Sequence, residues 1–168
     1  MERSKKLIFV SHCLLNQNAR PLGGEKYPGV VKDLLELFSE SGVGIIQIPC
    51  PQIEFNEGIN RKAKSKDSYE TDGFRLSCQK LSSNIIEKIE SYLRKSYSVL
   101  GILGVELSPT CGVYQIQNGR RSVPGKGIFI EELEKGMQKK NFQVPIIGVN
   151  LNNIFSSLEK VQSLLKFS

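Results

Sequence analysis

Hydrophobic residues fall into short continuous runs separated by longer stretches of helical spacing. The runs occupy residues 6–11, 44–48, 98–107 and 144–149, and each is rich in β-branched residues. Short apolar runs of this kind are typical of strands that are buried on both faces of a sheet. The sequence therefore predicts four buried strands.

Between the predicted strands, apolar residues recur every three or four positions, as they do on one face of a helix. Helices are predicted over 27–42, 74–93, from 128 onward and over 150–166. Strands that alternate with helices imply right-handed βαβ units. We therefore predict one α/β domain over residues 1–168, with an open, mainly parallel four-stranded sheet flanked by helices in a Rossmann-like three-layer arrangement.

Two polar segments interrupt this alternation. Residues 52–70 are polar, basic and irregular, which predicts a long functional loop or lid. Residues 117–127 are rich in glycine and arginine and predict a second loop.

Composition excludes several classes of protein. Of the 168 residues, 39% are hydrophobic and 24% charged, which supplies a core and argues against intrinsic disorder. No apolar run is long enough to span a membrane or to act as a signal peptide, so we expect a soluble cytoplasmic protein with no membrane partner. The net charge of +6 is spread along the chain without a nucleic-acid recognition motif, so a polar or anionic small molecule is the expected partner, rather than nucleic acid.

Three of the four cysteines lie just beyond the predicted strands. Cys13, Cys50 and Cys111 each follow the end of an apolar run within a few residues. Loops that leave parallel strands gather at one edge of the sheet, so the predicted fold brings these thiols together. Because a cytoplasmic chain rarely keeps structural disulfides, metal or cluster binding is the favoured interpretation, with inert buried thiols or a redox pair as alternatives.

The remaining candidates near these thiols are weaker. Cys78 falls within the longest predicted helix, on its apolar face, and is interpreted as a buried structural thiol. His12 is a possible fourth ligand, but next to Cys13 at the end of a strand it should point to the opposite side.

Three thiolates can hold two kinds of metal centre. One is a catalytic zinc ion with an open fourth position, and the other is an iron–sulfur cluster in which one iron lacks a protein ligand. Ligand type does not choose between them. The absence of paired C-x-x-C spacing argues only against ordinary zinc ribbons.

Three motifs carry a resemblance to a known family. Val-Ser-His-Cys-Leu-Leu-Asn at 10–16, Pro-Cys-Pro-Gln at 49–52 and Leu-Ser-Pro-Thr-Cys-Gly at 107–112 resemble, in order and spacing, the signatures of the thiouracil desulfurase family, formerly a domain of unknown function. The resemblance covers most of the chain and is closest to a divergent branch of TudS-related desulfidases. It implies that Cys13, Cys50 and Cys111 hold a 4Fe-4S cluster whose fourth iron is free to bind the sulfur of a thiolated base.

The chain departs from the family pattern in two places. Family members commonly read Cys-Pro-Glu at the second motif, whereas this chain has Gln52, with Glu54 two residues later. An Arg-Tyr-Asp-Gly stretch of the family is replaced by Arg-Pro-Leu-Gly at 20–23. The resemblance therefore predicts the cluster and leaves the substrate open.

The implied reaction is the hydrolysis of a carbon–sulfur bond, which requires a base for water and donors for the substrate. Glu54 is the candidate base, and Ser108 is a candidate donor to a cluster sulfur or to substrate, unless it only caps its own turn. Asn16 and Gln52 are candidates for reading a base edge, and Arg61 for anchoring a carbonyl or anion.

Three alternatives remain open. The first is a non-catalytic sulfur carrier or redox sensor that uses the same cluster, and the second is a three-Cys zinc hydrolase. The third, a nucleotide-binding module with adventitious thiols, lacks both G-x-G-x-x-G and G-x-x-x-x-G-K-[ST].

Overall fold

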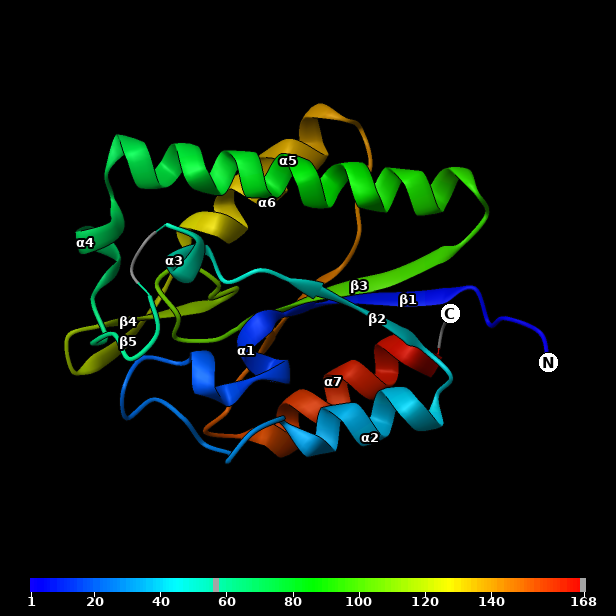
Figure 1. Cartoon of the computed structure of the whole chain (residues 1–168), viewed down its shortest axis with the longest axis horizontal. Helices are drawn as coiled ribbons and strands as arrows, with labels where there is room; N and C mark the ends of the chain where they lie inside the picture. Colours follow the sequence, from blue (N-terminus) through cyan, green and yellow to red (C-terminus); the bar gives the residue numbers. More distant parts are fainter. Residues whose placement is uncertain (56–57, 167–168) are drawn as a thin grey trace.

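A central parallel sheet lies between two layers of helices (Figure 1). The computed structural model describes residues 1–55 and 58–166. The sheet has the order β2-β1-β3-β6, and all neighbouring strands are parallel. Its strands are β1 (Lys6–Ser11), β2 (Gly44–Ile48), β3 (Ser98–Val105) and β6 (Ile146–Val149). The predicted α/β fold class with a four-stranded parallel sheet is confirmed.

The long helices cover both faces of the sheet (Figure 1). The pair α5 (Asp72–Arg94) and α6 (Ile128–Lys139) packs on one face, and the pair α2 (Lys32–Glu40) and α7 (Ile154–Lys166) packs on the other. The side chain of Thr71 caps α5 by accepting a hydrogen bond from the backbone N–H of Phe74 at 3.2 Å. Short helical segments connect these elements: α1 (His12–Leu15), η1 (Gln17–Ala19), α3 (Pro51–Glu54) and α4 (Lys66–Tyr69).

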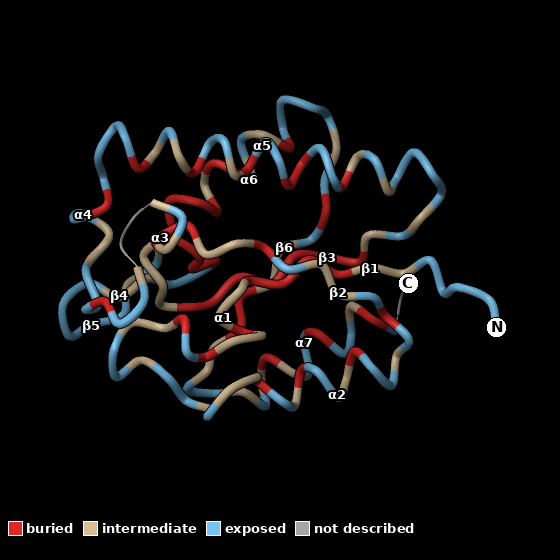
Figure 2. The backbone as a smooth tube through the Cα atoms, in the orientation of Figure 1, coloured by how far each residue is buried: buried red, intermediate tan, exposed pale blue. Residues whose placement is uncertain are grey.

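The core follows the strands, as the burial colours of Figure 2 show. Phe9, Ile102 and Leu103 have no exposed surface, because helices cover both sides of the inner strands β1 and β3. The continuous apolar runs in the sequence are explained by this two-sided burial.

One predicted loop is a β-hairpin. Within the segment expected to be a loop at 117–127, β4 (Gln115–Asn118) pairs antiparallel with β5 (Arg121–Pro124). Gly119, at a φ of +64°, begins the tight connection between them. The loop prediction was wrong because these strands are exposed and carry no continuous apolar run.

The segment predicted to be a long loop or lid contains buried side chains and forms part of a cavity wall. Residues 52–70 include the end of α3 and all of α4, and the side chains of Gln52, Arg61 and Tyr69 are buried. Positions 56 and 57 of this segment lie outside the described residues. The sequence pattern missed the burial because polar side chains make it.

One helix begins later than the sequence predicts. The helix expected over 27–42 begins only at Lys32. The residues before it are held by the segment after β1, because Gly29 O accepts from Gln17 N and Val31 N donates to Leu14 O.

Within residues 1–55 and 58–166, no helix combines the length and apolarity needed to cross a membrane.

Close backbone packing fixes the turn that carries Cys111. A Cβ atom added at Gly127 would overlap the backbone of Thr110 and Cys111, whereas Gly29 has no heavy atom within 4 Å of the same position. Space at Gly127 is therefore a structural requirement of the turn.

We predict that Gly127→Ala lowers the free energy of unfolding by about 1–3 kcal/mol, because backbone atoms cannot give way as a flexible side chain would. Gly29→Ala is the matched control and should be neutral or stabilising by up to about 1 kcal/mol. Urea denaturation of the two variants provides the measurement. Equal stability of both variants would contradict the packing described for Gly127.

Candidate functional site

Strand register brings the three cysteine segments to one edge of the sheet. Ser11 at the end of β1 lies opposite Ile48 at the end of β2, and Val10 lies opposite Leu103 in β3. Beyond these strand ends is a cavity of about 560 Å³, and Cys13, Cys50 and Cys111 all line it. The gathering predicted from the sequence is therefore present.

Cys13 lies in α1, directly after β1. The hydroxyl of Ser11 donates to the carbonyl of Leu103 at 2.8 Å, and the side chain of Gln17 donates to the carbonyl of Cys13 at 2.7 Å. His12 also lines the cavity. The strand ends at Ser11 and helix begins at His12, so the alternation of side chains in a strand no longer applies.

Cys50 is the residue before α3. Pro51 occupies the first position of this helix, where the missing N–H group costs nothing. The guanidinium of Arg61 donates from Nη2 toward Cys50 Sγ at 3.8 Å. A basic group therefore faces this sulfur.

Cys111 lies in a turn that folds back on the end of β3. Its carbonyl accepts from Val105 N at 2.9 Å, and its N–H donates to Ser108 Oγ at 3.0 Å. Leu107 has a φ of +73° and is held by backbone hydrogen bonds to Gln115 and Gln117. These bonds stabilise an unfavourable backbone conformation at the start of the cysteine turn.

Burial controls the acidity of two of these thiols. Burial raises the pKa of Cys13, and Arg20 offsets part of that rise. Burial also raises the pKa of Cys111, against a smaller lowering by the hydroxyl of Thr110. A metal bound at these sulfurs would displace their protons, so binding would weaken at low pH.

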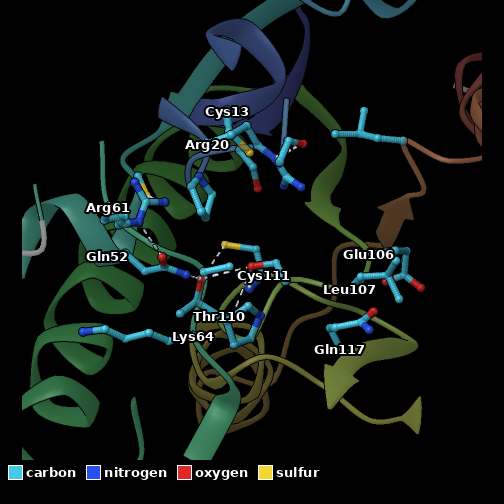
Figure 3. Close-up of a pocket in the computed structure, with 18 of the residues that line it drawn as sticks. Cys13, Arg20, Gln52, Arg61, Lys64, Glu106, Leu107, Thr110, Cys111 and Gln117 are labelled. Atoms are coloured by element: carbon cyan, nitrogen blue, oxygen red, sulfur yellow. Dashed lines mark hydrogen bonds between the residues drawn. The ribbon is translucent and has the colours of Figure 1, made fainter. Parts of the chain in front are cut away.

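Gln52 and Arg61 meet in the wall of the cavity (Figure 3). Arg61 Nε donates to Gln52 Oε1 at 2.7 Å, and the hydroxyl of Tyr69 donates to the same oxygen at 3.1 Å. Gln52 Nε2 donates to Thr110 Oγ1 at 3.2 Å. Arg61 also donates to the carbonyl of Ala19 at 2.8 Å. Gln52 and Arg61, two of the three residues predicted to bind substrate, are thus engaged by protein groups.

The other predicted site residues divide between the cavity and the surface. Ser108 lines the cavity, and its Oγ accepts from the backbone N–H groups of Thr110 and Cys111. Glu54 is exposed and does not line the cavity. Asn16 also lies outside the lining, where its Oδ1 caps η1 by accepting from Asn18 N at 3.1 Å.

The charged side chains that line the cavity are basic, with the exception of one carboxylate that was not predicted from the sequence. Among the described lining residues, Glu106 is the only carboxylate, and it accepts from Val113 N at 2.6 Å and Tyr114 N at 3.0 Å. The cations of the lining are Arg20, Lys26, Arg61 and Lys64. An acidic residue within the end of the apolar run at 98–107 was the available signal for Glu106.

Cys78 lies apart from the cavity lining. It is 1% exposed in the apolar core, as the sequence predicted. Across the described residues, no three His, Cys, Asp or Glu side chains are grouped tightly enough to hold a metal ion. Cys13, Cys50 and Cys111 therefore border a shared space and do not converge on one point.

Comparison with known proteins identifies a relative and a fold. No family model matches the chain. The uncharacterized protein MJ0003 of Methanocaldococcus jannaschii is 31% identical over 164 residues, which are 95% of this chain and 98% of the relative. A solved structure of the [4Fe-4S]-dependent thiouracil desulfidase TudS matches with a TM-score of 0.56 and 21% identity, covering 95% of this chain and 99% of the other. The latter match shows a shared fold.

We predict that iodoacetamide spares Cys78 in the folded, metal-free chain. Burial raises the pKa of Cys78 to about 12, so only about one thiol in ten thousand is a thiolate at pH 8. Cys50 is partly exposed and should react first. Peptide mass spectrometry measures the labelling, with the urea-unfolded chain as control. Labelling of Cys78 as fast as Cys50 would show that the helix does not shield it.

Proposed function

Because this chain belongs to the same protein family as MJ0003 of Methanocaldococcus jannaschii and has the fold of a thiouracil desulfidase, we propose that it is an iron–sulfur-dependent desulfidase. Its substrate would be a thiolated nucleobase-like molecule or another small thiocarbonyl compound. Water would replace the sulfur, giving the oxo product and sulfide. The observation that carries this proposal is the meeting of three cysteines from three strand ends at one cavity.

The donor set suits a cluster with one incompletely ligated iron. Cys13, Cys50 and Cys111 would each ligate a different iron of a 4Fe-4S cluster. Soft thiolates suit such a cluster as well as zinc, and all three sulfur-bearing residues line one cavity. When bound, the cluster would supply a Lewis-acid position for the substrate sulfur.

The cavity provides a setting for a polar or anionic substrate. Lys26, Arg20 and Lys64 lie in the lining with the cysteines, and one carboxylate opposes them. A basic, partly enclosed cavity concentrates anions and orients them. These cations would hold the substrate while its thiocarbonyl faces the cysteines.

The roles of acid and base differ in their support. Ser108 lies in the lining, but its Oγ accepts from the backbone N–H groups of Thr110 and Cys111 and lies 3.3 Å from Thr110 Oγ1, so we propose that it supports the turn of Cys111 instead of binding substrate. Glu54 lies outside the lining, so its role as base has no geometric support. Glu106 lines the cavity as a carboxylate and is the better candidate for holding the attacking water, through the oxygen that carries the weaker backbone contact, at 3.3 Å from Tyr114 N.

We predict that anaerobic reconstitution yields about four irons and about four acid-labile sulfides per chain, with a broad visible absorption. Cys13→Ser, Cys50→Ser and Cys111→Ser should each lose most of the iron, because each removes one of three ligands. Cys78→Ser is the matched control and should keep it. Metal analysis and the absorption spectrum provide the readout.

A colourless protein that binds one zinc per chain would contradict the cluster and support the three-Cys zinc hydrolase. Loss of the chromophore only in Cys78→Ser would show that the ligand set is wrong.

We predict that the reconstituted chain releases sulfide from a thiouracil or a related thiocarbonyl compound under anaerobic conditions. Substrate loss is followed by its ultraviolet absorption and sulfide by a colorimetric assay. Cys50→Ser should reduce turnover by at least about a hundredfold, since the site would lose a ligand. An intact cluster without turnover on a panel of thiocarbonyl compounds would favour the sulfur carrier or redox sensor.

A further inference from the structure

A buried chain of hydrogen bonds connects Arg61 to the sulfur of Cys111. It runs from Arg61 Nε to Gln52 Oε1 at 2.7 Å, from Gln52 Nε2 to Thr110 Oγ1 at 3.2 Å, and from Thr110 Oγ1 to Cys111 Sγ at 3.5 Å. All four side chains are at least nine-tenths buried. We call these residues, in this order, the Arg61 relay.

The direction of the first hydrogen bond is fixed by chemistry. A guanidinium carries donors only, so the group of Gln52 that faces Arg61 must be the carbonyl oxygen. Tyr69 donates to the same oxygen at 3.1 Å and supports this orientation. The amide nitrogen of Gln52 must then face Thr110, and Thr110 Oγ1 must accept from it.

Ser108 removes the remaining freedom of the Thr110 hydroxyl. Ser108 Oγ accepts from Thr110 N at 3.3 Å and from Cys111 N at 3.0 Å, which uses both of its lone pairs. Its proton is therefore directed to Thr110 Oγ1, 3.3 Å away. Thr110 Oγ1 then accepts twice, from Gln52 and Ser108, and its own proton is left for Cys111 Sγ.

We propose that Gln52 and Arg61 are positioning residues that direct the hydroxyl of Thr110 onto the sulfur of Cys111. This inference rests on the proposed function where it concerns a bound cluster. Arg61 also donates to Cys50 Sγ at 3.8 Å, so one guanidinium influences two of the three sulfurs. This role of Gln52 and Arg61 differs from the binding of substrate that the sequence suggested, because the polar atoms of Gln52 already have partners within the protein.

The neutral amide at position 52 is essential to this arrangement. A carboxylate there could still accept from Arg61 and Tyr69, but its second oxygen would face Thr110 as an acceptor. The Thr110 hydroxyl would turn toward this oxygen and leave the sulfur of Cys111. Hydrogen bonds to ligating sulfurs raise the reduction potential of a cluster, so their loss lowers it.

The first test uses the full-length, metal-free chain. In isotope-labelled protein, NMR should show nuclear Overhauser contacts from the Gln52 side-chain amide protons to Thr110, and from a slowly exchanging Thr110 hydroxyl proton to the β protons of Cys111. Amide protons of Gln52 that face Arg61, or a Thr110 hydroxyl proton that faces Ser108, would overturn the inference. This test does not require a cluster.

The second test measures the reduction potential of the reconstituted chain by spectroelectrochemical titration. Thr110→Val should shift the potential to a more negative value, and Thr110→Ser should restore it, because serine keeps the hydroxyl. Gln52→Glu should also shift it to a more negative value. Part of that shift arises from the added charge alone.

The double variant separates the effect of the added charge from the effect of redirecting the Thr110 hydroxyl. In the Thr110→Val background, Gln52→Glu should shift the potential by less than it does in the wild type, because no hydroxyl remains to be redirected. Additive shifts, or a Thr110→Val potential equal to wild type, would overturn the inference while iron and sulfide content still support the cluster. Absence of a cluster in the wild type would contradict the proposed function, and the NMR contacts would still decide the direction of the relay.

Discussion

Parallel pairing in register at the carboxyl ends of β1, β2 and β3 is the constraint on which the site depends. Ser11 opposite Ile48 and Val10 opposite Leu103 align the points where the chain leaves the sheet. A slip of one residue would turn each buried strand residue to the other face. The short segment from a strand end to Cys13 or Cys50 then leaves each thiol little choice of position.

The third cysteine reaches this edge by a different route. Cys111 is six residues beyond the end of β3 and returns because its carbonyl accepts from Val105 N at 2.9 Å. Glycine at position 127 leaves room for the turn, and Glu106 binds the backbone of Val113 and Tyr114 just beyond it. These contacts hold the turn of Cys111 in place, as a metal ligand requires.

The sheet and the gathering of three cysteines at its edge could be predicted, because each leaves a recognisable pattern of residues in the sequence. Strands buried on two faces read as apolar runs, and three thiols at the ends of such runs must meet at one edge. The hairpin at 115–124 was not predictable in this way, because its strands are exposed. The burial of Arg61 was also not predictable from the sequence. Its charged group is satisfied by hydrogen bonds to Gln52 and Ala19, and such bonds leave no apolar pattern in the sequence. The position of Glu54 was also not predictable, since the end of α3 leaves it exposed outside the cavity lining, whereas Glu106 lines the cavity.

The central claim is that three cysteines hold a cluster with one chemically distinct iron. Mössbauer spectroscopy of the chain reconstituted with ⁵⁷Fe, with and without a thiocarbonyl substrate, tests it most directly. The account predicts one iron in four with its own isomer shift, and a change at that iron alone when substrate is added. Four equivalent irons that do not respond to substrate, or a protein that binds zinc and no iron, would contradict it.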